Sequence, residues 1–274
     1  MMKINGINYH VAIQLRKQEA ETLVFLHGFT GSSSSWLEVL NYFPSYNLIC
    51  IDIIGHGKTE SPLDSSRYEM KEVIKDIITI LDKLNLDQVN MIGYSMGGRL
   101  ALSVAASYPN RIKRLILESS SPGLDDPVQR ENRKKADLQL AADITNHGIV
   151  EFVNKWENIP LFESQRLLPA KKQEKIRQQR LKNSPTGLAN SLIGIGTGTQ
   201  PSLWGELSQL SIPVLLLCGE WDEKFCDIAI KMNNLLQISV KKQINFAGHA
   251  IHVEQPQFFG KIVNEFLINN DIFE

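Results

Sequence analysis

The sequence predicts an α/β fold in which a mostly parallel central sheet is flanked by helices. Short apolar runs bounded by turn residues alternate with stretches of helical periodicity, which is typical of parallel strands joined by crossover helices. Of the 274 residues, 43% are hydrophobic and 22% are charged. This composition is that of an ordinary globular protein, so the chain is long enough and apolar enough to bury one large core.

The expected elements follow one another in the order that such a sheet requires. Antiparallel strands are expected near residues 2–5 and 9–15, before the parallel part of the sheet begins. The core strands are expected over 22–27, 47–52, 88–93, 112–119, 214–219 and 241–246. Apolar spacing of three and four residues predicts helices over 34–43, 70–84, 97–108, 225–234 and 257–269.

A long insertion interrupts this alternation. From about residue 122 to residue 204 the chain has charge-rich helical stretches and no strand-like run. We therefore predict a core domain of residues 1–121 and 205–274 and a helical cap of residues 122–204. Such a cap is expected over the carboxyl edge of the sheet.

Charge and hydropathy exclude several classes of partner. The net charge of −1 gives no basic surface for nucleic acid or for an anionic membrane. No stretch approaches 18 consecutive apolar residues, and the first residues have no apolar signal region. We therefore expect a cytoplasmic protein without nucleic-acid or membrane partners, either a monomer or a weak homo-oligomer.

The cysteines predict neither a disulfide framework nor a metal site. Cys50, Cys218 and Cys226 are odd in number, and two of them lie in apolar strands. Buried reduced thiols are the expected state, because no C-x-x-C pair occurs. No metal ligands are predicted.

Ser95 lies at a turn between a predicted strand and a predicted helix. Residues 93–97 read G-Y-S-M-G, directly after the apolar run 89–92. A G-x-S-x-G motif in this position is typical of a nucleophile elbow, where the glycines allow a sharp turn and the hydroxyl is exposed at the helix N-terminus.

The chain also supplies a base and an acid in the matching order. Asp222 ends the apolar strand 214–219 and its turn, and His249 follows the predicted strand 241–246. A serine hydroxyl needs such a base in order to react. The order Ser95, Asp222, His249 is that of the α/β-hydrolase fold. We therefore predict this fold, with the three residues as its catalytic triad.

Two further loops belong to the predicted site or its surroundings. The segment 27–31, H-G-F-T-G, follows the first core strand, so the backbone N–H groups of Phe29 and Met96 are expected to form an oxyanion hole. The loop 52–59 matches a structural loop common to the fold, and we expect His56 to pack there rather than to act as a second base.

Arg99 indicates the charge of the substrate. It lies one helical turn after Ser95, so its guanidinium can reach the same cavity, where it would bind a carboxylate. Its spacing also allows an exposed position on the helix. Epoxide hydrolases and dehalogenases of this fold are disfavoured, because they need an aspartate where this chain has Ser95.

Six segments of the chain resemble one family. They read H-G-F-T-G-S (27–32), G-Y-S-M-G-G-R (93–99), E-S-S-S-P-G-L (118–124), W with P-L-F (156 and 160–162), G-T-G-T-Q-P-S-L-W (196–204) and G-E-W-D-E-K-F (219–225). Nearly the whole chain resembles the 2-succinyl-6-hydroxy-2,4-cyclohexadiene-1-carboxylate synthases of menaquinone biosynthesis (MenH). The arginine of the second segment and the fifth segment are the most specific of these motifs.

The resemblance implies a reaction and a set of binding residues. Members of this family eliminate pyruvate from 2-succinyl-5-enolpyruvyl-6-hydroxy-3-cyclohexene-1-carboxylate without metal or organic cofactor. This substrate is a small-molecule tricarboxylate, and three arginines of the family bind it. The first corresponds to Arg99. The second corresponds to Arg133 in preference to Arg130, and the third to Arg180, whose face Arg177 can share. Tyr94 and Trp156 match cavity-lining aromatic positions, with core packing as the alternative for Trp156.

Three functions remain open at this stage. In a lyase, Ser95 would act as a base toward the proton α to the succinyl ketone, assisted by His249 and Asp222. In a carboxylesterase, thioesterase or C–C hydrolase, the same serine would attack an acidic substrate covalently. A ligand receptor that retains the triad without turnover is the third possibility. The resemblance favours the lyase.

Overall fold

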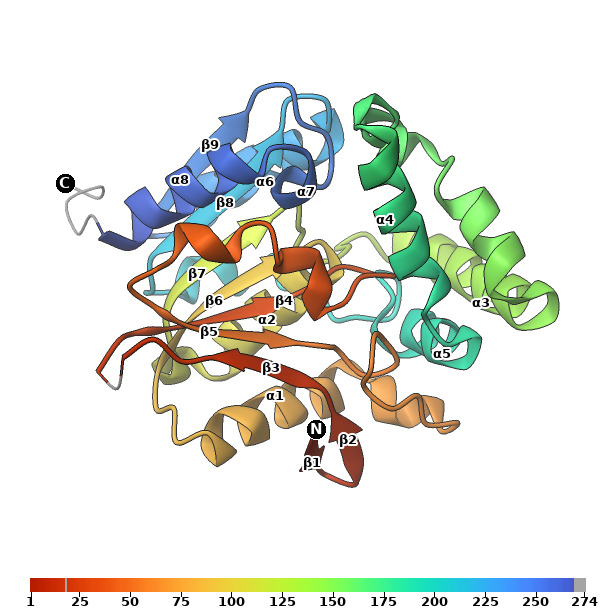
Figure 1. Cartoon of the computed structure of the whole chain (residues 1–274), viewed down its shortest axis with the longest axis horizontal. Helices are drawn as coiled ribbons and strands as arrows, with labels where there is room; N and C mark the ends of the chain where they lie inside the picture. Colours follow the sequence, from red (N-terminus) through yellow and green to blue (C-terminus); the bar gives the residue numbers. More distant parts are fainter. Residues whose placement is uncertain (18, 269–274) are drawn as a thin grey trace.

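The computed structural model describes residues 1–17 and 19–268, and a seven-stranded sheet forms its centre (Figure 1). The spatial order of the strands is β3 (Val11–Gln14), β5 (Asn47–Ile51), β4 (Thr22–Leu26), β6 (Val89–Tyr94), β7 (Ile112–Glu118), β8 (Val214–Gly219) and β9 (Ser239–Ile244). β3 pairs antiparallel with β5, and the other neighbours pair in parallel. The predicted mostly parallel sheet is therefore confirmed. A separate hairpin joins β1 (Met2–Ile4) and β2 (Ile7–Tyr9).

The central strands are buried along their whole length, which explains their continuous apolar sequences. Every residue of β4, β5, β6 and β8 is buried, as expected for parallel strands covered on both faces. Leu26 of β4 lies opposite Gly93 of β6, and Gly93 lies opposite Leu117 of β7. The loops that follow these three strands therefore meet at one edge of the sheet.

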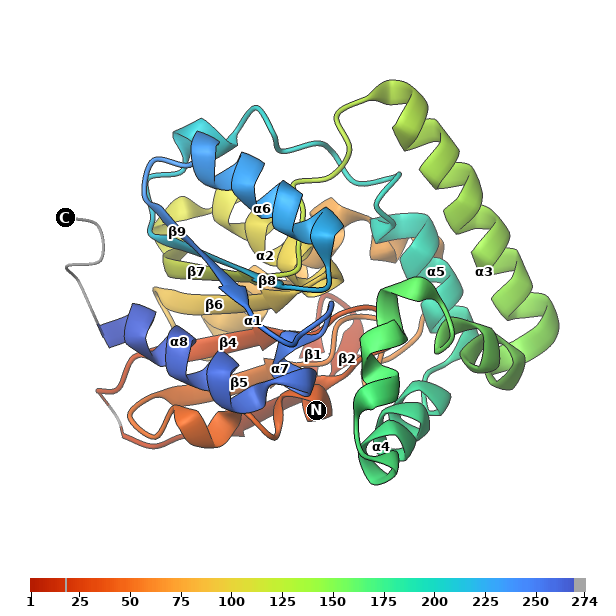
Figure 2. The ribbon, with the colours of Figure 1, turned by 90° about the horizontal axis from the view of Figure 1, so that it is seen from above.

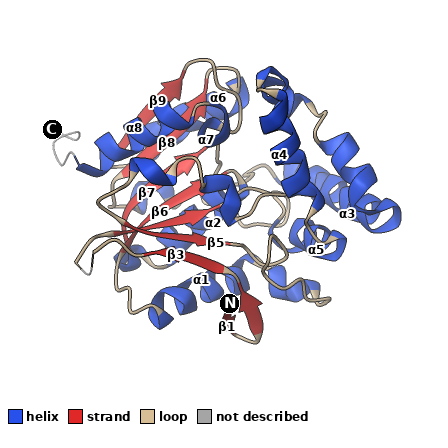
Figure 3. Cartoon of the chain, in the orientation of Figure 1, coloured by secondary structure: helices blue, strands red, loops and turns tan. Residues whose placement is uncertain are grey.

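Helices cover both faces of the sheet (Figures 2 and 3). On one face lie α1 (Met70–Lys83), α2 (Met96–Ser107) and α6 (Glu223–Leu235), whose apolar side chains share one core cluster with the strands. On the other face lie α7 (Ile251–Glu254) and α8 (Pro256–Ile268), packed with Trp36 and Phe43 in a second cluster. Among the described residues, no helix is both long enough and apolar enough to cross a membrane.

Residues 122–204 contain α3 (Pro127–Trp156), a 3-10 helix (Pro160–Leu167), α4 (Ala170–Leu181) and α5 (Pro185–Ile195). Figures 1 and 2 show these helices together on one side of the sheet. α3 is interrupted at Gly148, whose φ of 79° lies in the region that favours glycine. Side chains of α3 and α5 form a third apolar cluster, against which Phe29 packs. The helical segment is thus joined to the sheet through the loop after β4.

The predicted elements differ from the observed ones in a few places. The segment 34–43, predicted to be a helix, forms two short 3-10 helices over Ser33–Trp36 and Leu40–Tyr42 and not one continuous helix. Buried Trp36 and Val39 are three residues apart, a spacing that 3-10 turns also satisfy. β9 ends at Ile244, because Phe246 turns with a φ of 56°. Asn269, the last residue of the helix predicted over 257–269, lies outside the described residues.

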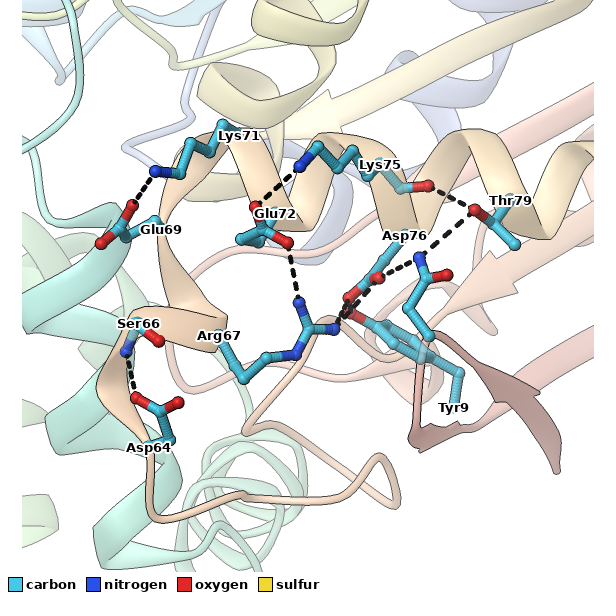
Figure 4. A network of polar contacts seen from close by, with 11 residues as sticks. Tyr9, Asp64, Ser66, Arg67, Glu69, Lys71, Glu72, Lys75, Asp76 and Thr79 are labelled. Atoms are coloured by element: carbon cyan, nitrogen blue, oxygen red, sulfur yellow. Dashed lines mark hydrogen bonds and ion pairs between the residues drawn. The ribbon is translucent and has the colours of Figure 1, made fainter.

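A buried carboxylate ties the N-terminal hairpin to α1 (Figure 4). Asp76 of α1 is fully buried and accepts hydrogen bonds from the Tyr9 hydroxyl at 2.7 Å and from Asn5 Nδ2 at 2.8 Å. Arg67 forms an ion pair with it at 3.0 Å. Burial, with the charge of Asp76, raises the pKa of Tyr9 well above its ordinary value. The network satisfies a charge that burial alone would strongly disfavour.

Candidate active site

Ser95 lies in a strained turn between β6 and α2. Its φ of 50° and ψ of −108° are unusual for a residue with a side chain, as in a nucleophile elbow. A Cβ atom at Gly93 would overlap the backbone of Gly97, and a Cβ atom at Gly97 would overlap the carbonyl of Leu26. The two glycines of the motif are therefore required by close backbone packing.

Three loops bring Ser95, His249 and Asp222 into one hydrogen-bonded chain. The Ser95 hydroxyl lies 3.0 Å from His249 Nε2, and His249 Nδ1 lies 2.6 Å from Asp222 Oδ2. In the tautomer that fits, Nδ1–H donates to Asp222 and Nε2 accepts from Ser95. His249 and Asp222 are both buried. This geometry allows the histidine to take up the serine proton.

Glu254 holds the loop that carries His249. One of its carboxylate oxygens accepts the backbone N–H of Gly248 at 2.6 Å, and the other accepts that of Ala250 at 3.3 Å. Burial raises the pKa of the Glu254 carboxyl. Glu254 could not be predicted from the sequence, because its role depends on backbone contacts that no motif encodes.

The loop after β4 lies beside the elbow. A Cβ atom added to Gly28 would overlap the Tyr94 ring and lie 3.5 Å from Ser95 Cβ. Phe29 and Met96 line the same cavity as Ser95. His27 anchors this loop, because its Nε2 accepts the backbone N–H of Ile53 at 2.9 Å. The two residues expected to form an oxyanion hole are thus close to Ser95.

Ser95 and His249 line a cavity of about 670 Å³ between the sheet edge and the helical segment. The aromatic part of its lining consists of Phe29, Tyr94, Trp156, Phe162 and Phe225. The Trp156 ring meets the edges of its neighbours, with centroids 5.4 Å from Phe29 and 5.8 Å from Phe162. Trp156 Nε1 is buried and has no hydrogen-bond partner within residues 1–17 and 19–268.

Two arginines contribute positive charge to the cavity. Arg99 is buried in the lining and donates to the carbonyl of Ile195 at 2.7 Å and to Gln200 Oε1. Burial, with the charge of Arg133, lowers the pKa of Arg99 to about 10, so its guanidinium stays charged at neutral pH. Arg133 lines the cavity and its Nε lies 2.8 Å from Asp137 Oδ1. Arg130 instead donates to the carbonyl of Gln200 and does not line the cavity.

Arg180 lies next to the cavity and is not part of its lining. In this position it cannot make the direct contact with the substrate that the resemblance implies. It lines an adjoining pocket of about 290 Å³ together with Arg177. Its guanidinium lies 4.6 Å from the centroid of Phe162 and donates to Gln165 Oε1 at 3.0 Å. Arg177 is paired with Glu157. Phe162 thus separates Arg180 from the cavity in this conformation.

The positive charge of Arg180 still acts on one residue of the cavity. Burial raises the pKa of the Tyr94 hydroxyl well above its ordinary value, and the nearby Arg180 opposes that rise. Tyr94 also packs against the His249 ring, with centroids 5.4 Å apart. Tyr94 therefore stays protonated beside the histidine.

Comparisons with known proteins show which family the chain resembles. The model of the α/β-hydrolase fold family matches residues 21–256. A Bacillus subtilis (strain 168) protein, provisionally named 2-succinyl-6-hydroxy-2,4-cyclohexadiene-1-carboxylate synthase, is 48% identical over 96% of both chains. A synthase of that name from Photorhabdus laumondii subsp. laumondii is 32% identical over 89% of this chain and 84% of its own.

A solved structure, described as MenH from S. aureus, superposes with a TM-score of 0.91. It is 40% identical and covers 94% of this chain and 97% of its own. The chain therefore belongs to the α/β-hydrolase fold family and, within it, to the family of 2-succinyl-6-hydroxy-2,4-cyclohexadiene-1-carboxylate synthases, MenH.

Proposed function

We propose that this protein is a lyase of menaquinone biosynthesis. It eliminates pyruvate from 2-succinyl-5-enolpyruvyl-6-hydroxy-3-cyclohexene-1-carboxylate and forms 2-succinyl-6-hydroxy-2,4-cyclohexadiene-1-carboxylate. Relatives that match nearly the whole chain carry the name of this activity. The observation that carries the proposal is that Arg99 and Arg133 line the same cavity as Ser95. A tricarboxylate needs such cations beside the reacting group.

The first step is removal of the proton α to the succinyl ketone. His249, oriented by Asp222, takes the hydroxyl proton of Ser95, and the serine oxygen takes the substrate proton. Ser95 therefore acts as a base and forms no acyl-enzyme. The buried position of His249 and Asp222 supports this proton transfer, because their hydrogen bond is shielded from water.

The second step moves the electron pair through the ring. Proton removal places negative charge on the ketone oxygen, where the N–H groups of Phe29 and Met96 would each contribute about 3 kcal/mol of stabilisation. The electrons then form the first double bond of the diene, the existing ring double bond shifts, and the carbon–oxygen bond to the enolpyruvyl group breaks. The released enolpyruvate becomes pyruvate on taking up a proton.

The helical segment of residues 122–204 completes the site as a cap. It supplies Arg133 and Trp156 to the cavity, while the core of residues 1–121 and 205–274 supplies Ser95, His249 and Arg99. A closed cap helps because no water takes part in the elimination. Arg180 of the cap adds positive charge behind Phe162. We also infer that the enzyme acts in the cytoplasm, as a monomer or weak homo-oligomer and without cofactor.

The direct test is turnover of the enolpyruvyl substrate by the purified protein. Pyruvate and the absorbance of the diene should appear together in equal amounts. In a separate assay, p-nitrophenyl acetate should give no burst of p-nitrophenol. A burst without pyruvate formation would instead identify a serine hydrolase, and tight binding without any turnover would identify a receptor.

A further inference from the structure

A third cation lies at the edge of the cavity. Lys224 is in the first turn of α6, two residues after Asp222, and it is exposed to solvent. It lines the cavity of Ser95 and also an adjoining pocket of about 660 Å³. His249 and Leu161 line both spaces as well. Lys224 thus stands where the cavity opens toward this second pocket.

Lys224 differs from the arginines because none of the described residues accepts a hydrogen bond from it. Arg99 is held by Ile195 and Gln200, Arg133 by Asp137 and Arg180 by Gln165. For Lys224, no hydrogen bond or ion pair is found among the described residues. Its ammonium lies 5.8 Å from the centroid of the Phe225 ring. An anion that binds this ammonium therefore breaks no hydrogen bond or ion pair of the part of the chain that the structure describes.

The position of Lys224 relates it to the reacting groups. Phe225, the next residue, packs against the His249 ring with centroids 4.7 Å apart. Arg99 and Arg133 approach the cavity from α2 and α3, whereas Lys224 approaches it from α6. The positive end of the α6 dipole lies at the same place and also favours an anion. The cavity is thus bordered by cations from separate elements.

We propose that Lys224 binds one carboxylate of the substrate at the mouth of the cavity, and so acts as a specificity-determining residue. The proposal rests on the proposed function, since it assigns a cation to one of the three carboxylates of that substrate. Three carboxylates line the adjoining pocket, Glu163, Asp222 and Glu223, and none of them lies within ion-pair distance of Lys224. The ammonium therefore remains available to the ligand.

The test compares Lys224→Met with Lys231→Met, which removes an exposed lysine from the same helix. Lys224→Met should raise KM for the enolpyruvyl substrate by roughly tenfold and change kcat by less than about twofold, because a contact made equally in the ground and transition states alters binding alone. Lys224→Arg should keep KM close to that of the unchanged protein. Lys231→Met should leave both constants unchanged.

Calorimetric titration with propane-1,2,3-tricarboxylate provides a readout that does not depend on turnover. Lys224→Met should weaken its binding by a similar factor. Unchanged KM and unchanged tricarboxylate affinity in Lys224→Met overturn the role of Lys224, even if the unchanged protein releases pyruvate. Weaker tricarboxylate binding by this variant supports the anion site at Lys224, whether or not the unchanged protein releases pyruvate. Absence of pyruvate release by the unchanged protein would contradict only the proposed reaction.

Discussion

Asp222 precedes α6 at a position where a carboxylate commonly caps a helix, yet its side chain makes no capping hydrogen bond. Its Oδ2 lies 2.6 Å from His249 Nδ1 instead. The carboxylate therefore fixes the tautomer of the histidine, with the proton on Nδ1 and the lone pair of Nε2 toward Ser95. The Asp222 carboxylate thus orients His249 and does not cap α6.

We expect Asp222→Asn to lower kcat by about 10³- to 10⁴-fold with little change in KM, because an amide in this place favours the wrong histidine tautomer. Steady-state pyruvate release measures both constants. Circular dichroism shows whether the fold is retained. A loss of less than tenfold in a folded variant contradicts the role assigned to Asp222.

Two buried histidines link stability to pH. Burial lowers the pKa of His56 from 6.5 to about 3, and burial also lowers the pKa of His27. At pH values between about 3 and 6.5, His56 binds a proton in the unfolded chain and not in the folded protein. Stability is therefore lost as the pH falls below about 6.5, and the His56 contribution continues to fall until about pH 3.

Replacing His56 with Gln should flatten this dependence by up to about 1.4 kcal/mol per pH unit. Urea unfolding at several pH values between 6 and 4 measures the slope. His147→Gln, at an exposed position of α3, is the matched control. An equal slope in the His56 variant and the unchanged protein contradicts the assignment.

At the scale of elements, Asp76 connects α1 with the N-terminal hairpin and with the 3-10 helix Ser65–Tyr68. We expect Asp76→Ala to lower the free energy of unfolding by about 3–5 kcal/mol, because Arg67 and the Tyr9 hydroxyl lose their buried partner. Tyr9→Phe removes a single hydrogen bond and should cost about 1 kcal/mol. Urea unfolding separates the two. Equal losses contradict the central place of Asp76.

The core strands and the turn at Ser95 could be predicted from the sequence because their signals are local. β4 and β6 are continuous apolar runs, and Ser95 is marked by glycines that the backbone requires. The segment 34–43 could be predicted as helical but not as two 3-10 helices, because buried residues three apart fit a 3-10 helix as well as an α-helix. Local sequence patterns thus predict where an element lies better than they predict which type of helix it forms.

The cap side chains could not be placed from the sequence. Arg130 and Arg133 are three residues apart, and only the rotation of α3 decides which one faces the cavity. Arg180 turned against Phe162 and Gln165. Lys224 follows Asp222 by two residues in the sequence, but its approach to the cavity depends on the packing of α6. Such placements follow from tertiary structure.

Across the whole molecule, the charges nearly balance, but positive side chains gather at one cavity. The net charge is −1, whereas Arg99, Arg133 and Lys224 border one cavity. Salt should therefore act on binding: the Debye length falls from about 30 Å at 0.01 M to about 10 Å at 0.1 M. We expect added sodium chloride to raise KM and to leave kcat nearly constant. Steady-state kinetics over this range, with sucrose to control for viscosity, measure the effect. A KM independent of salt contradicts carboxylate binding by these cations.

Ser95 is proposed to be the base that starts pyruvate elimination. The most direct measurement is the rate of pyruvate release from the enolpyruvyl substrate by the unchanged protein and by a folded Ser95→Ala variant. We expect equal amounts of pyruvate and diene from the unchanged protein, and a rate about 10²- to 10⁴-fold lower from the variant. Nearly full pyruvate release by Ser95→Ala would contradict the role of Ser95 as the base.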